Sequence, residues 1–98
     1  MTGLPAAKLP SICPGDYERK RVSHAFGETL RITRLRQGLS QDNLSDRSGL
    51  DRTYPSMLER GLRHPTLYML LRLADGLGVM PQQLVTDTVA RLRKEFPP

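Results

Sequence analysis

The chain has 98 residues, which fit one small domain and exclude the large enzyme folds. Hydrophobic residues make up 38% of the sequence and charged residues 26%, and with two Phe, three Tyr and no Trp the core should be aliphatic. Fifteen Lys and Arg against ten Asp and Glu give a net charge of +5, which favours a polyanionic partner, while the single Cys13 cannot form an intramolecular disulfide and gives no sign of an oxidising compartment.

Residues 1–22 are expected to form a flexible basic N-terminal arm. Three prolines and Gly15 interrupt the first fifteen residues, and no periodic apolar pattern lies between them. The start of the chain lacks the pattern of a signal peptide, and no segment is apolar enough to cross a bilayer. We therefore expect a cytoplasmic protein that does not enter a membrane.

The folded unit is expected to occupy residues 23–86 and to begin with two helices. The apolar spacing from Phe26 to Gln37 predicts an amphipathic first helix. Ser40 is placed to cap a second, shorter helix. Gly49 is placed to end it, because glycine adopts the left-handed conformation of a helix end without steric cost.

A third short helix should follow and end at Gly61, with either Asp51 or Thr53 as its cap. Pro55 bears on this choice, because proline inside a helix removes a hydrogen bond but is tolerated in the first turn. A helix capped by Asp51 includes Arg52, whereas a helix capped by Thr53 excludes it. Two short helices joined around a glycine form a helix-turn-helix unit, expected here over residues 41–60.

Two further helices are predicted, and no strand. Thr66 can cap a fourth helix. Its apolar stripe should form the main core and consists of Leu67, Leu70, Leu71, Ala74 and Leu77. Pro81 can start a fifth helix. Residues 87–98 should extend that helix, and its apolar stripe is a candidate dimer contact that consists of Val85, Val89, Leu92 and Phe96.

The stretch from Phe26 to Leu84 resembles the DNA-binding domain of the Cro and phage-repressor (XRE) type. The resemblance is carried by short motifs at consistent spacing, which are GLSQ at 38–41, SGL at 48–50, LERG at 58–61, HPTL at 64–67 and LGV at 77–79. It implies an all-α, five-helix lambda-repressor-like domain behind the arm. It also implies that Arg34 and Glu59 form a structural ion pair.

The same resemblance implies sequence-specific binding to double-stranded DNA by a transcriptional regulator of the repressor kind. A homodimer would insert the helix at residues 52–60 into the major groove. The positions that would face base edges are Arg52, Thr53, Ser56 and Met57. The positions that would meet phosphates are Gln41, Arg60 and Arg63.

The distribution of charge leaves an alternative open. Residues 39–65 hold four Arg and four acidic residues, whereas residues 1–38 carry a net charge of +4 and include the adjacent cations Arg19, Lys20 and Arg21. This basic stretch either follows the DNA backbone or is a solvated arm. The neutral motif and Pro55 favour the alternative of an antitoxin-like or adaptor module that binds a protein partner.

An enzyme is not expected. Cys13 lies in the predicted arm, and His24 and His64 are isolated in the sequence from any Asp or Cys that could act with them. The sequence also holds no phosphate-binding glycine loop and no set of metal ligands at workable spacing. Neither a cofactor nor a metal is therefore predicted.

Overall fold

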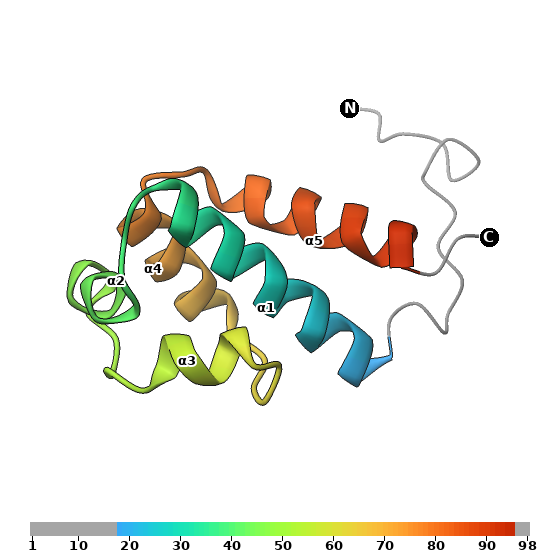
Figure 1. Ribbon diagram of the computed structural model, residues 1–98, viewed down its shortest axis with the longest axis horizontal. Coiled ribbons are helices and arrows are strands. Elements are labelled where there is room, and N and C mark those ends of the chain that lie inside the picture. The colour runs from blue at the N-terminus through green and yellow to red at the C-terminus, as the bar shows by residue number, and fades with distance from the viewer. Residues whose placement is uncertain (1–17, 96–98) are drawn as a thin grey trace, which may run out of the picture.

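The computed structural model describes residues 18–95, which form five helices and, within that range, no strand (Figure 1). The helices are α1 (Arg19–Arg36), α2 (Gln41–Ser48), α3 (Tyr54–Glu59), α4 (Leu67–Leu77) and α5 (Pro81–Glu95). In Figure 1, α1 runs through the middle of the molecule, with α5 along one side and α3 on the other. The predicted all-α, five-helix fold is confirmed.

The first helix is longer than its apolar pattern indicated. It begins at Arg19 rather than Phe26, so residues 19–22 of the predicted arm are helical and the predicted boundary at residue 22 is wrong. The added turns are held by packing, since Ser23 and Ala25 are buried. Small side chains such as these give little apolar signal in a sequence. The rest of the predicted arm, with Cys13, lies outside the described residues.

The predicted caps of α2 and α4 are confirmed. The Ser40 hydroxyl accepts a hydrogen bond from the backbone N–H of Asn43 at 3.0 Å, and the Thr66 hydroxyl accepts one from Met69 at 3.2 Å. Each bond satisfies a donor that has no partner within its own helix. Gly49 ends α2 with a φ of +69°, in the left-handed region that glycine occupies without strain.

The core is a leucine cluster to which all five helices contribute. Its largest fully buried hydrophobic side chains are Leu30, Leu44, Leu58, Leu73, Leu77, Leu84 and Leu92. The predicted stripe on α4 is partly wrong, because Leu67 is 71% exposed and Leu71 is 47% exposed. The inner side of α4 carries Leu73 instead, with Ala74 and Leu77 as predicted.

The predicted apolar stripe of α5 is divided between the interior and the surface. Leu92 is fully buried in its own chain, and the buried Thr88 donates its hydroxyl to the Leu84 carbonyl at 2.7 Å. Val85 is 48% exposed, and Phe96 lies outside the described residues. Only the outer part of this stripe is therefore free for contact with another molecule. None of the helices in residues 18–95 is both long and apolar enough to cross a membrane.

Candidate nucleic-acid interface

α3 is held against α1 by a close approach of the two backbones. A Cβ atom added at Gly27 would lie 2.5 Å from the carbonyl oxygen of Leu58 and 2.8 Å from that of Glu59. Such distances are not tolerated, so only glycine allows α1 to lie this close to the end of α3. The Leu58 side chain completes the anchor, because it is fully buried in the core.

The carboxylate of Glu59 joins α1, α2 and α3. It accepts two hydrogen bonds from the Arg34 guanidinium, at 2.6 Å from Nε and 3.0 Å from Nη2, so the predicted ion pair is present. A third bond comes from Gln41 Nε2 at 3.0 Å, and Arg34 also donates to the Leu39 carbonyl at 2.8 Å. The hydrogen bond to Glu59 raises the pKa of Arg34. Two-point contacts of this kind fix orientation as well as distance.

α2 is fixed to α4 by two arginines. Arg72 Nε donates to the carbonyl of Ser48 at 2.8 Å, and Arg47 Nε donates to the carbonyl of Gly76 at 2.7 Å. The carbonyls near a helix end lack partners inside the helix, so a guanidinium satisfies them well. Gly76 also allows a close approach, because a Cβ there would lie 3.1 Å from the Ser48 nitrogen. The two helices of the motif are thus both attached to the core.

The turn before α3 is organised by Asp51. Its carboxylate accepts hydrogen bonds from the backbone N–H of Thr53 at 3.2 Å and from the Thr53 hydroxyl, and its carbonyl accepts one from the Tyr54 N–H at 3.0 Å. The hydroxyl bond and then the backbone bond lower the pKa of Asp51. The helix that follows starts at Tyr54, so Thr53 stands at its N-cap position without making a side-chain cap, and the predicted start at residue 52 is wrong.

Pro55 explains the late start of α3. It is the second residue of the helix, where a backbone N–H has no partner within the helix, so its missing donor costs no hydrogen bond. Its ring is fully buried among the core side chains. Proline therefore serves here as an inward-packing apolar residue.

Arg52 lies outside α3, in the turn that precedes it. Its Nη2 lies 2.8 Å from Oδ2 of Asp42, in a pair whose side chains are 75% and 60% exposed. The hydrogen bond with Asp42 is the main reason that the pKa of Arg52 is raised. A pair this exposed is screened by water and salt and holds the arginine only weakly.

The remaining predicted site residues follow one another along the edge of the molecule formed by α3 and the turn after it (Figure 1). Thr53 is exposed, Ser56 and Met57 are half-buried on α3, and Arg60 and Arg63 are exposed in the turn. Gln41 starts α2 and is linked to α3 through Glu59, which occupies one of its amide donors.

Two residues near this edge were not predicted as part of it. Tyr54 is half-buried, and burial raises the pKa of its phenol while the positive charge of Arg63 acts in the opposite direction. His24 of α1 lies against the turn after α3, because a Cβ added at Gly61 would lie 3.2 Å from its Nδ1. The contact of His24 could not be predicted from local sequence, since α1 is far from α3 along the chain.

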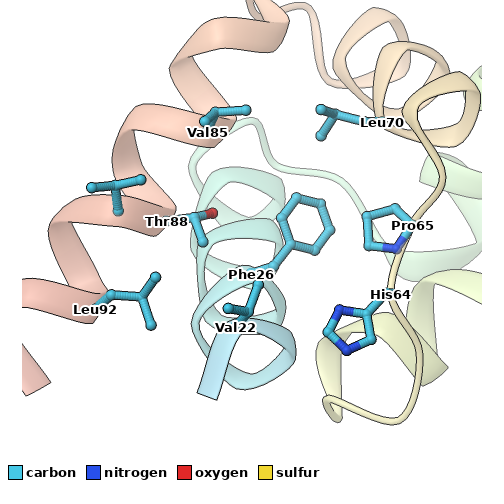
Figure 2. A pocket seen from close by; sticks show the side chains of 9 residues that line it. Val22, Phe26, His64, Pro65, Leu70, Val85, Thr88 and Leu92 are labelled. Carbon is cyan, nitrogen blue, oxygen red and sulfur yellow. The ribbon is translucent and has the colours of Figure 1, made fainter. Parts of the chain in front are cut away.

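An apolar groove with a volume of about 260 Å³ lies beside α5 (Figure 2). Figure 2 shows the ring of Phe26 projecting from α1 towards Pro65, with α5 on the other side. The groove is lined by Val22, Phe26, His64, Pro65, Leu70, Val85, Thr88, Val89 and Leu92. Within residues 18–95, no three His, Cys, Asp or Glu side chains converge as metal ligands would.

Comparisons with known proteins agree with this architecture. The HTH-type transcriptional regulator y4dJ of Sinorhizobium fredii is 44% identical over 62 residues, which are 63% of this chain and 80% of that protein. The structure of the restriction-modification controller protein C.AhdI from Aeromonas hydrophila is 44% identical, with a TM-score of 0.62 over 63% of this chain and 94% of that one. The hypothetical transcription factor NHTF from Neisseria is 31% identical, with a TM-score of 0.66 over 89% of this chain and 97% of that one. Residues 25–86 match the family model described as a helix-turn-helix domain, and the chain belongs to this family.

Proposed function

We propose that this protein is a regulator of transcription that binds double-stranded DNA sequence-specifically as a homodimer, with α3 in the major groove. The observation that carries the proposal is the way α3 is held. Gly27, Leu58 and the Glu59 network fix its inner side, while Thr53, Arg60 and Arg63 remain exposed along its outer edge. A rigid short helix with exposed polar side chains is what groove recognition requires. The relatives named above as regulators and controllers support the same role.

The proposed roles divide the edge into base-reading and phosphate-binding positions. Thr53, Ser56 and Met57 face base edges. Met57 offers an apolar contact, for example to the methyl group of thymine. Arg60 and Arg63 contact phosphates on either side of the groove. Binding also releases Arg52 from Asp42, which frees its guanidinium for a two-point contact to guanine. Gln41 reaches a phosphate with the amide hydrogen that Glu59 does not use.

A dimer is part of the proposal because the surface that one domain presents to DNA is small. One such domain contacts few base pairs, so specific binding uses two half-sites about 34 Å apart. α4 exposes Leu67 and Leu71, and α5 exposes Val85 at the apolar groove, and exposed apolar surface is what protein interfaces cover. We assign this surface to the second copy. Because the relatives are bacterial proteins and bacterial DNA lies in the cytoplasm, the proposal places the protein there.

The decisive experiment is selection of bound duplexes from a random pool, followed by titration of binding against salt. The proposal expects an enriched inverted repeat and a log affinity that falls linearly and steeply with log salt concentration, because phosphate contacts release counterions. The zero net charge of residues 39–65 favours one competing function, a module that binds a protein. A flat salt dependence without an enriched site would contradict DNA binding and support that module.

A further inference from the structure

One side of α1 runs along α3 and the turn that follows it. Three residues of α1 make contacts on this side. Arg34 binds Glu59, Gly27 lies against the backbone carbonyls at the end of α3, and His24 lies against Gly61. Their spacing of seven and three residues is that of a single helix face. The next position on that face towards the N-terminus is four residues before His24, and it is Lys20.

Lys20 is exposed and lies about one helical turn before His24, the residue that lies against Gly61. Figure 1 shows the first turns of α1 at the same edge of the molecule as α3 and this turn. Lys20 therefore belongs to the face of α1 that is turned towards α3 and the turn after it.

The positive charges in the first turn of α1 destabilise the helix when no DNA is bound. Arg19, Lys20 and Arg21 occupy the turn, no acidic residue does, and Glu18 before it makes no side-chain cap. Cations at a helix N-terminus are unfavourable, because the aligned peptide dipoles already give that end a partial positive charge. A bound polyanion would reverse this penalty.

The excess positive charge of the chain also lies outside the motif. Residues 39–65 are electrically neutral in sum, whereas α1 alone holds six Arg and Lys and one Glu. The match to the family model begins at residue 25, so the first turn of α1 lies outside the matched residues.

We propose that the first turn of α1, through Lys20, is an additional phosphate-binding element that contacts the DNA backbone beside the bases that α3 reads. This inference rests on the proposed function and names a further part of its interface. The ligand is the phosphodiester backbone of duplex DNA, and the contact carries no sequence information.

The test compares Lys20→Gln, Lys20→Arg and the wild-type chain on the selected duplex and on a random duplex over a range of salt concentrations. The slope of log affinity against log salt should be smaller by about 0.9 per protomer in Lys20→Gln, as expected for one lost phosphate contact. Lys20→Arg should restore the slope. Affinity for the two duplexes should fall by the same factor, and the midpoint of thermal unfolding should stay unchanged or rise.

The matched control is Arg93→Gln, which removes one exposed positive charge from α5, on the side of α1 away from α3. It should leave the slope unchanged. An unchanged slope in Lys20→Gln, or an equal decrease in Arg93→Gln, would overturn the inference while leaving the proposed function intact. A wild-type chain that binds neither duplex would instead refute the proposed function.

Discussion

Gly27 shows how one residue can determine the position of a functional helix. Its hydrogen occupies the space between α1 and two carbonyl oxygens of α3, both within 3 Å of where a Cβ would stand. A larger residue must push α3 outwards, together with the side chains proposed to read DNA. The sequence alone does not identify this glycine, because a glycine within a helix pattern usually signals only weaker helix propensity.

Gly27→Ala should lower the free energy of unfolding by about 1–3 kcal/mol, the usual cost of adding a methyl group to a filled site. It should also lower the affinity for the selected duplex. Urea unfolding and fluorescence anisotropy measure the two effects. Glu28→Ala, at the exposed neighbouring position, should change stability by no more than about 0.5 kcal/mol. Equal behaviour of the two variants would refute the role given to Gly27.

Asp51 gives a prediction about pH. The hydrogen bonds from Thr53 hold the pKa of its carboxyl below the ordinary value of 3.8. A carboxyl with a lowered folded-state pKa stabilises the fold at pH above its unfolded-state value, and this contribution is lost as pH falls through the folded-state pKa. The turn before α3 should therefore remain ordered at neutral pH and loosen only in strong acid.

Carboxyl chemical shifts followed by NMR over a pH titration test this interpretation. Asp51 should titrate below 3.8, and Thr53→Val should move its pKa upwards, because the hydroxyl bond is the largest cause of the shift. If the pKa of Asp51 is the same in Thr53→Val as in the wild-type protein, the hydroxyl does not hold the carboxylate.

Among the residue contacts, the sequence predicted those that the family motif carries. The Arg34–Glu59 pair was expected and is present, and so are the Ser40 and Thr66 caps. The bond from Gln41 to the same carboxylate was not expected, because it depends on how α2 approaches α3 in space. The local sequence gives no sign of that approach.

At the scale of elements, α3 is the shortest of the five described helices, and Pro55 explains where it begins. The sequence left two starts open, and the structure selects the later one because Pro55 then needs no hydrogen-bond donor. The α4 stripe was misplaced for a different reason. Leucines surround much of that helix, so periodicity alone could not decide which of them face inwards.

Pro55→Ala should destabilise the protein even though alanine has the higher helix propensity. The substitution removes buried methylene groups, which costs about 0.8 kcal/mol for each group, and it releases backbone freedom in the unfolded chain. Chemical denaturation should give a loss of roughly 1–2 kcal/mol. Pro81→Ala, at the half-buried start of α5, is the matched control and should cost less. If Pro55→Ala is more stable than the wild-type protein, burial of the Pro55 ring does not stabilise the core.

At the scale of the molecule, charge and apolar surface are separated. Most of the excess positive charge lies on α1, whereas exposed apolar side chains lie on α4 and α5. The distribution of charge along the sequence predicted the basic stretch, and helical periodicity predicted an apolar stripe on α5, but which of its residues are exposed depends on how the helices pack. A deletion of residues 88–98 cannot test the dimer, because Thr88 and Leu92 belong to the core of the same chain.

Val85→Glu is the sharper test of the dimer. A charge placed in the apolar contact should shift the sedimentation coefficient from that of a dimer to that of a monomer. Affinity for the inverted repeat should then fall far more than affinity for random duplex, since only the former requires two linked domains. Thr86→Glu adds the same charge at the neighbouring exposed position and should leave the dimer intact. Monomeric wild-type protein at working concentrations would contradict the assignment.

The three-helix junction at Glu59 has a consequence for redesign of this protein. Its bonds use side chains on the inner side of α3 and leave Ser56 and Met57, the proposed base-reading positions of α3, without a part in them. Target preference can thus be reprogrammed at those two outer positions while the scaffold keeps its shape. A library that randomises both should yield folded variants with new operators at high frequency.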